Sequence, residues 1–350
     1  MADARLDRIV LIGKAGTKRH LKIYKDGLTG PIVASVDPRG RWLAYVNSRG
    51  VLRLQDIEYG KTISLIESRK GWAIRAIRWM PISRRMLVLS SRKEPTYRPD
   101  SGFVTGFEPR TQVFAFDPEA GSIGPPLIDV PETASAWSSG DMIRALWPHY
   151  LASEGDWMAT FTSGSLHVLN ESNGEQTSLE LDILKAPDVE PPSNNLPAMS
   201  RNGRMVTYKN GAAIYLRQIY DKSFSRKVMN IKSEDQPAMV WPDDRSLIVA
   251  NLERYSPGMP SQTTIASYHV DQGGNVSRNK HLRIKVDWPI LYLSHRISPD
   301  SKGIAIGVIK SPKNQLVIYS LNKKELIYLP LGFEVKSPVE ILGWSKDWDD

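Results

Sequence analysis

The residues best suited to recognition are arginine, lysine, tyrosine and tryptophan side chains in the segments that connect β-prone runs. Arg, Tyr and Trp are enriched in the hot spots of binding surfaces, because each combines a large contact area with hydrogen-bond donors. The same pattern would arise if the aromatic rings packed these segments onto the body of the protein and the cations were merely solvated. The candidate binding residues are Arg69, Lys70, Trp72, Arg92, Lys93, Tyr97, Arg98, Arg110, Trp137, Arg254 and Tyr255.

Residues that could carry out catalysis are sparse in the sequence. There is no cysteine, which excludes a thiol nucleophile, a thiolate metal site and a disulfide. The six histidines stand at positions 20, 149, 167, 269, 281 and 295, without the short-range spacing of a metal site. Neither a glycine-rich phosphate loop nor a Gly-x-Ser-x-Gly nucleophile elbow occurs. We therefore expect no catalytic residue, metal, cofactor or enzymatic activity, with a site in a central channel as the less favoured alternative.

The composition is that of a folded globular chain. It has 350 residues, 41% of them hydrophobic, with 46 Lys and Arg against 38 Asp and Glu and a net charge of +8. The basic excess leaves nucleic acid or another polyanion open as an alternative to a protein partner. No apolar run reaches the about 18–20 residues of a membrane span, and residues 1–10 lack a signal-peptide core. We expect a soluble cytoplasmic chain, or a periplasmic or exported one if a signal peptide has been removed.

Residues 35–65 set a pattern that the rest of the chain repeats. The tight turn Asp37-Pro38-Arg39-Gly40 leads into an apolar run at Trp42, and two further turn-and-strand units follow. Equivalent apolar runs begin at positions 86, 157, 205, 247 and 304. Most of these intervals are near the about 40–50 residues of a four-stranded propeller blade, and the longer ones carry insertions.

We predict an all-β fold, a single seven-bladed β-propeller domain of four-stranded antiparallel blades over residues 1–350. Six blades are expected at about residues 31–66, 74–128, 143–182, 196–231, 237–286 and 290–330. The seventh would combine residues 5–28, as second and third strands, with residues 339–350 as a first strand. Joining them would close the ring and remove two exposed sheet edges. The alternative is that the sequence stops within a blade and a further blade or domain follows.

The turn before the second strand of each unit resembles that of the TolB and WD40-like propeller superfamily. In that family a Ser-Pro-Asp-Gly-Lys/Arg turn leads into an apolar strand. Ser298-Pro299-Asp300-Ser301-Lys302-Gly303 is the best match, and Ser200-Arg201-Asn202-Gly203-Arg204 keeps the turn without its proline. The Gly-His and Trp-Asp signatures of eukaryotic WD repeats are absent. The resemblance spans the whole chain and implies a propeller fold, but it implies no particular function.

The insertions in the repeat are expected to gather on one face. Residues 92–110 and 251–264 lie between a second and a third strand, and residues 129–144 and 184–196 link blades. In a propeller both kinds of connection project from the same face, and insertions on one face mark a binding surface. We therefore predict a non-catalytic scaffold or adaptor that binds a protein partner, alone or within a larger complex, with nucleic-acid binding as the alternative.

Overall fold

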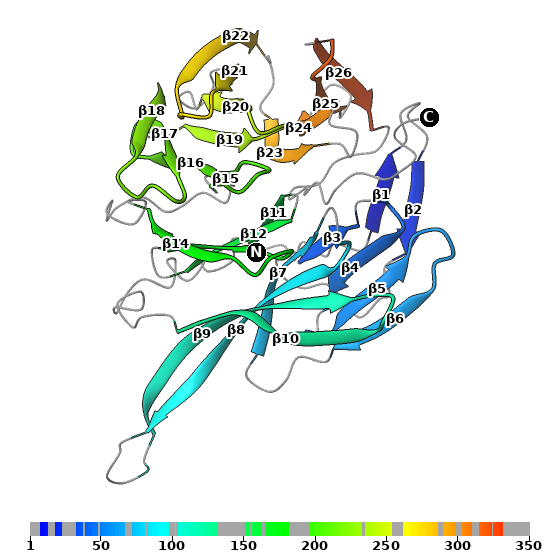
Figure 1. The fold of residues 1–350 in the computed structure, drawn as a ribbon. Helices are drawn as coiled ribbons and strands as arrows, with labels where there is room; N and C mark the ends of the chain where they lie inside the picture. The colour runs from blue at the N-terminus through cyan, green and yellow to red at the C-terminus, as the bar shows by residue number, and fades with distance from the viewer. Residues whose placement is uncertain are drawn as a thin grey trace. The chain divides into compact units, whose positions relative to one another are not determined.

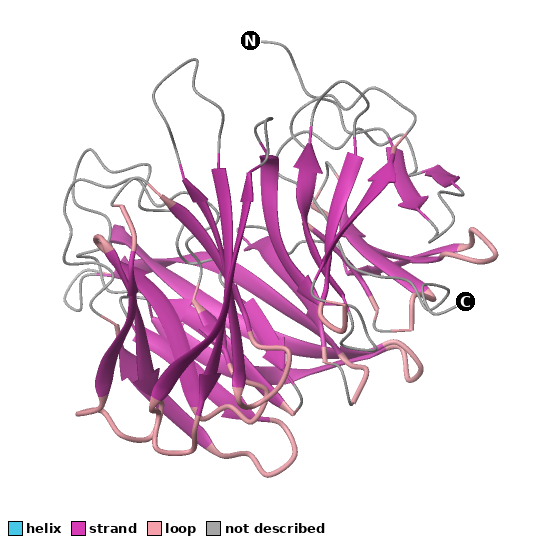
Figure 2. Cartoon of the chain, turned by 90° about the horizontal axis from the view of Figure 1, so that it is seen from above, coloured by secondary structure: helices cyan, strands magenta, loops and turns pink. Residues whose placement is uncertain are grey.

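The fold was analysed in a computed structural model. The structure describes residues 8–12, 18–22, 33–37, 39–47, 50–66, 72–80, 83–97, 102, 104–131, 151–154, 156–162, 165–181, 197–232, 235–253, 262–285, 290–297, 303–309, 315–323 and 325–331. The regular secondary structure in these ranges is β-strand throughout (Figure 2). No helix long and apolar enough to cross a membrane occurs among these residues.

Six four-stranded antiparallel sheets follow one another along the chain, and we call them blades 1 to 6. In each blade the strands lie side by side in chain order (Figure 1). Blade 1 contains β3 (Ala34–Val36), β4 (Trp42–Val46), β5 (Leu52–Asp56) and β6 (Thr62–Ile66). Blade 2 contains β7 (Trp72–Trp79), β8 (Met86–Tyr97), β9 (Val104–Asp117) and β10 (Ser122–Pro131). Blade 3 contains β11 (Leu151–Glu154), β12 (Trp157–Thr162), β13 (Ser165–Asn170) and β14 (Gln176–Glu180).

The second half of the chain repeats this plan. Blade 4 contains β15 (Ala198–Met199), β16 (Met205–Asn210), β17 (Ala213–Gln218) and β18 (Ser225–Asn230). Blade 5 contains β19 (Gln236–Val240), β20 (Ser246–Glu253), β21 (Gln262–Val270) and β22 (Val276–Lys285). Blade 6 contains β23 (Ile290–Ile297), β24 (Gly303–Ile309), β25 (Gln315–Ser320) and β26 (Glu325–Pro330). The predicted second strands are confirmed, since β4, β8, β12 and β16 begin at the predicted residue and β20 and β24 begin one residue earlier.

The described residues form six four-stranded blades, not the seven that were predicted. The N-terminal half of the predicted seventh blade is present as a two-stranded sheet of β1 (Arg8–Ile12) and β2 (Lys18–Lys22). Its other half, residues 339–350, lies outside the described residues. The chain divides into two compact units, residues 1–9 with 21–181, which hold blades 1 to 3, and residues 10–20 with 182–350, which hold blades 4 to 6.

Within each unit, neighbouring blades pack through apolar residues at alternate strand positions. Along β8, Met86 and Val88 pack in the cluster with blade 1, while Leu87 and Leu89 pack in the cluster with blade 3. A second strand is therefore apolar on both faces, because each face meets a neighbouring blade. In unit 2, Leu247 of β20 likewise belongs to the cluster with blade 4 and its neighbour Ile248 to the cluster with blade 6.

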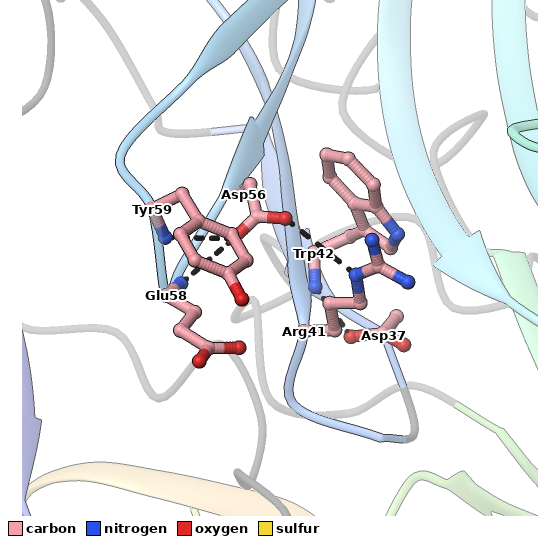
Figure 3. Close-up of polar contacts among 6 residues, drawn as sticks. All are labelled: Asp37, Arg41, Trp42, Asp56, Glu58 and Tyr59. Atoms are coloured by element: carbon pink, nitrogen blue, oxygen red, sulfur yellow. Dashed lines mark hydrogen bonds and ion pairs between the residues drawn. The ribbon is translucent and has the colours of Figure 1, made fainter.

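In blades 1 to 3, an Asp or Asn at the end of the third strand folds the turn that follows it. The Asp56 Oδ1 accepts hydrogen bonds from the backbone N–H groups of Glu58 and Tyr59, each at 2.9 Å (Figure 3). Asn170 closes the equivalent turn of blade 3 by accepting from the N–H groups of residues 172 and 173 at 2.9 and 3.2 Å. Such side chains replace the backbone acceptors that a tight turn lacks. This local chemistry explains why Asp and Asn suit the ends of these third strands.

The turn between first and second strands is built in a similar way. In blade 1, Asp37 Oδ1 accepts from the backbone N–H of Trp42 at 2.7 Å. Burial raises the pKa of Asp37 above its ordinary value of 3.8, and the hydrogen bonds from Trp42 and Arg39 oppose that rise. Arg41 lies 3.5 Å from Asp56 Oδ2 and 5.1 Å above the Trp42 ring, which ties the two turns of the blade together.

Candidate functional site

The predicted binding end of blade 2 carries a hairpin that is longer than the blade itself. β8 and β9 pair from Met86↔Phe116 out to Tyr97↔Val104. The two flanking strands do not reach as far, because β7 begins opposite Arg92 and β10 ends opposite Arg110. Residues 93–97 and 104–109, which we call the arm, are therefore paired only with each other among the described strands. At about 3.4 Å per residue the arm extends about 17 Å beyond the blade, and Figure 1 shows β8 and β9 projecting past β7 and β10.

The prediction that residues 92–110 form an inserted loop was wrong for most of that segment. It continues the two strands of the hairpin rather than leaving them. Thr96, Tyr97, Val104 and Phe107 are β-prone residue types, and strands already in register extend by adding further ladder pairs. The first and last residues of the segment 251–264 are also in strands. The ladder of β20 and β21 continues there from the pair Asn251↔Thr264 to the pair Glu253↔Gln262.

One line across blade 2 brings together three candidates from separate segments. Trp72 pairs in register with Arg92, Arg92 pairs with Arg110, and Arg110 pairs with Pro131. This line, which we call the basal row, runs across β7, β8, β9 and β10 at the point where the arm leaves the blade. β7 begins and β10 ends at this row, and these two strand ends connect to the neighbouring blade linkers. The hairpin and the linkers therefore emerge from the same end of blade 2.

Arg110 is the candidate whose side chain the structure describes, and its contact fixes the base of the arm. Its Nε donates to Asp129 Oδ1 on β10, and the two charges form an ion pair. The hydrogen bond from Arg110 is the main reason that the pKa of Asp129 is lowered. Thr111, next along β9, is fully buried. The arm therefore begins at an anchored position.

The remaining candidates divide into two groups. Trp72, Arg92, Lys93 and Tyr97 have described backbone positions in β7 and β8. The other six lie outside the described residues, as do most of the two predicted linkers at residues 129–144 and 184–196. They are Arg69, Lys70, Arg98, Trp137, Arg254 and Tyr255.

A buried polar cluster holds the corresponding end of blades 4 and 5. The Lys209 Nζ at the end of β16 donates to the backbone oxygen of Asp235 at 2.6 Å. The Asn251 Nδ2 on β20 donates to Asp235 Oδ2 at 2.8 Å, and the backbone N–H of Lys232 donates to the same oxygen at 3.0 Å. Lys209, Asp235 and Asn251 are 7%, 2% and 4% exposed. The cluster joins the second strand of blade 4, the blade linker and the base of the β20–β21 hairpin.

Sequence reasoning missed this cluster, although one signal pointed to it. Lys209 occupies the strand position that is Val46 in blade 1 and Ala250 in blade 5, as the matching backbone bonds of Arg41, Arg204 and Arg245 show. A lysine where the repeat has apolar residues is expected to find a buried partner, because an unpaired buried charge is very costly. The partner could not be identified, since Asp235 stands in a variable linker.

No group of three or more His, Asp and Glu side chains that could hold a metal occurs among the described residues. His167 on β13 pairs in register with the buried Thr160, and burial lowers the pKa of His167 below its ordinary value of 6.5. A histidine kept neutral beside a strand hydroxyl fits a structural role.

The matches found among known proteins are to distant solved structures. No protein-family model matches the chain, and no curated protein matches its sequence. A chain of a mitotic checkpoint complex is 9% identical, with 85% of this chain and 90% of that one covered and a TM-score of 0.39. Oligogalacturonate lyase from Vibrio parahaemolyticus is 12% identical, covering 92% and 70%, with a TM-score of 0.40. A eukaryotic initiation factor is 14% identical, covering 93% and 84%, with a TM-score of 0.41.

The class of the protein follows from its own blades. Consecutive four-stranded antiparallel sheets, with strands in chain order and apolar contacts between adjacent sheets, are the building units of a β-propeller. The chain is therefore an all-β protein of the β-propeller class. The solved structures named above are too distant in sequence and geometry to indicate a function for it.

Proposed function

We propose that this chain is a non-catalytic scaffold or adaptor that binds a protein partner through the hairpin end of its blades. The observation that carries the proposal is the arm, a hairpin extended about 17 Å beyond its own blade on a base held by the Arg110–Asp129 ion pair. A preformed projecting element loses little conformational entropy on binding, which favours recognition.

The basal row suggests the chemistry of the partner. Trp72, Arg92 and Arg110 stand in register on adjacent strands. Tryptophan and arginine are the residue types that most often dominate binding energy, and arginine pairs with carboxylates in a fixed two-point geometry. The partner that fits best is a protein surface that presents acidic side chains around an apolar centre.

The proposal is tested by removing the arm while keeping the blade. Residues 93–109 would be replaced by an Asn-Gly turn, which suits a two-residue hairpin. Tagged full-length chain and this variant would be used for affinity capture from the native source, followed by mass spectrometry. We expect partners of the full chain to be lost from the variant, and a charge reversal of Arg92→Glu with Arg98→Glu to weaken their capture.

The matched control is Arg39→Glu with Lys61→Glu, which changes the charge equally at exposed positions of blade 1. It should leave capture unchanged. Recovery of the same partners by the arm-less variant, provided that it melts like the parent, would overturn the assignment of this end as the binding end. Turnover of a small-molecule substrate by the purified chain would overturn the non-catalytic role.

We also propose that the chain is a member of the TolB or WD40-like superfamily, that it has a seventh blade and that it is cytoplasmic. β1 and β2 are a pair of strands that a third strand from residues 339–350 would extend. Closing a sheet ring removes exposed edges, so deleting residues 339–350 should lower the melting temperature by several degrees. An unchanged melting temperature would argue against closure by the two ends. Cell fractionation with an antibody to the chain tests the location.

A further inference from the structure

Among the described outermost strands, Lys and Arg residues occur on two, and both belong to unit 2. The fourth strand of each blade is its outermost one, and six such strands are described. β6, β10, β14 and β26 contain no Lys or Arg between their first and last residues. β18 and β22 contain no Asp or Glu and carry six cations, Arg226, Lys227, Arg278, Lys280, Arg283 and Lys285.

The strand register places most of the β22 cations on one side of the sheet. Ala266 and Tyr268 on β21 pack in the core cluster shared with blade 4. Residues directly opposite in an antiparallel ladder share a face of the sheet. The face toward blade 4 therefore includes the β22 positions opposite Tyr268, Ala266, Thr264 and Gln262, which are Arg278, His281, Arg283 and Lys285.

The outer strand of blade 4 faces the same seam. Arg226 on β18 pairs in register with Leu216, which belongs to that core cluster. Its Nη1 donates to Asn275 Oδ1 in the β21–β22 turn at 2.6 Å, and its guanidinium lies 5.8 Å from the Phe224 ring. The Tyr268 hydroxyl donates to Met229 Sδ of β18 at 3.3 Å. Blades 4 and 5 are thus in contact along their rims, and the Arg226 side chain lies in that contact.

Protection of an open sheet edge does not account for this arrangement. Lys on an edge strand discourages edge-to-edge pairing, and a single charge is enough for that purpose. The other four outermost strands have the same kind of edge and no Lys or Arg. Placing four cations on one strand without a carboxylate also adds self-repulsion, which an anionic ligand would relieve.

We propose that the seam between the outer strands of blades 4 and 5 binds the phosphate backbone of a single-stranded nucleic acid. The positions from Arg278 to Lys285 span about 24 Å at about 3.4 Å per residue, which suits a polymer of evenly repeated charge. Arg presents a planar donor fork that fits phosphate oxygens. Backbone contacts of this kind bind without reading sequence.

The test is the salt dependence of binding to a labelled oligothymidylate of about 16 nucleotides, near the upper end of single-strand site sizes. Fluorescence anisotropy with the full chain should give log K against log salt with a slope of about −3, the value for about four phosphates on a single strand. Arg283→Glu with Lys285→Glu should weaken binding at least tenfold and flatten the slope. If the charge-reversed variant does not fold, Arg283→Gln with Lys285→Gln is measured instead. It should weaken binding and flatten the slope to a smaller degree.

Arg39→Glu with Lys61→Glu on blade 1 is the matched control and should bind like the parent. A flat salt slope, or parental affinity in the β22 variants, would overturn the proposal. Tighter binding to polyglutamate than to the oligonucleotide would overturn it in favour of an acidic protein. The arm-less variant should keep oligonucleotide binding, because the seam is independent of the arm and of the protein partner proposed for it.

Discussion

Trp241 and Thr207 join blades 5 and 4 through a buried hydrogen bond. The indole Nε1 of Trp241, just after the first strand of blade 5, donates to Thr207 Oγ1 on the second strand of blade 4 at 3.3 Å. Trp79 stands at the end of the first strand of blade 2 and donates to the backbone oxygen of Ser35 in blade 1, also at 3.3 Å. The same residue type thus links adjacent blades in both units, at the same end of the first strand.

Replacing Trp241 with Phe should destabilise the chain by about 2–3 kcal/mol. The change removes a buried hydrogen bond and leaves a cavity beside a fully buried Thr207. Urea unfolding followed by fluorescence or circular dichroism measures the difference. Tyr59→Phe is the control, because Tyr59 is 75% exposed and should change stability by less than about 0.5 kcal/mol. Equal midpoints for Trp241→Phe and the parent would remove the role given to this contact.

Gly274 and Gly174 offer a matched pair of substitutions. Both have positive φ, at 76° and 74°. A Cβ on Gly274 would lie 2.4 Å from the Phe224 Cζ, whereas a Cβ on Gly174 would meet nothing within 4 Å. Gly174→Ala should therefore cost only the backbone strain, about 1–2 kcal/mol. Gly274→Ala should cost at least about 1 kcal/mol more, since Phe224 must move away from Arg226.

The same urea titration would check this difference. Equal free energies of unfolding for the two alanine variants would show that Phe224 can move without loss of stability. The contact between the rims of blades 4 and 5 would then be looser than the distances indicate.

Lys209→Met should destabilise unit 2 by about 1–3 kcal/mol, the cost of a buried acceptor left without its donor. The Lys209 Nζ donates to the backbone oxygen of Asp235, and both residues are buried. Methionine fills much the same space but cannot donate a hydrogen bond. Urea unfolding of the variant and the parent measures the loss. Equal midpoints would show that this hydrogen bond adds nothing to stability.

Stability should fall as the pH drops through the ordinary range of histidine. Burial lowers the pKa of His167 in the folded chain, so the unfolded chain binds the proton more readily between that pKa and about 6.5. The contribution of His167 to the free energy of unfolding is fully present above about pH 6.5 and is lost as the pH falls below that value. The pKa of Asp37 is raised, so its contribution has the opposite sign and changes only nearer to pH 4.

His167→Gln should therefore lose less stability than the parent between pH 7.5 and pH 5.5, as measured by thermal or urea unfolding at each pH. Identical pH profiles for the two proteins would place the acid sensitivity elsewhere.

The repeat could be predicted from sequence because its signals are local. Turn residues at fixed distances from apolar runs located the second strands, as at Trp42 and Met205. The arm could not be predicted in the same way. Residues 92–97 and 104–110 are mostly charged, proline or polar, so they lack the apolar alternation of a half-buried strand. They form strands because the hairpin below them is already in register.

The binding surfaces show the same limit. The candidates in the arm and basal row were chosen by residue type and position between strands, and register then placed Trp72, Arg92 and Arg110 in one line. The Lys209 cluster and the basic seam depend on residues brought together from different strands and linkers. Arg283 and Lys285 alternate with Leu282 and Ile284 along β22, but the side of the sheet on which the basic positions lie depends on a bulge between Ser267 and Tyr268.

The arm also has a consequence for the behaviour of the protein in concentrated solution. A free two-stranded ribbon offers backbone donors and acceptors to any other chain, which is how edge-to-edge stacking starts. Pro95 in β8 and Pro109 in β9 each remove one such donor from the arm. The two prolines thus lower the capacity of the arm's edges for strand addition, and we expect contacts with the arm to depend more on side chains than on backbone pairing.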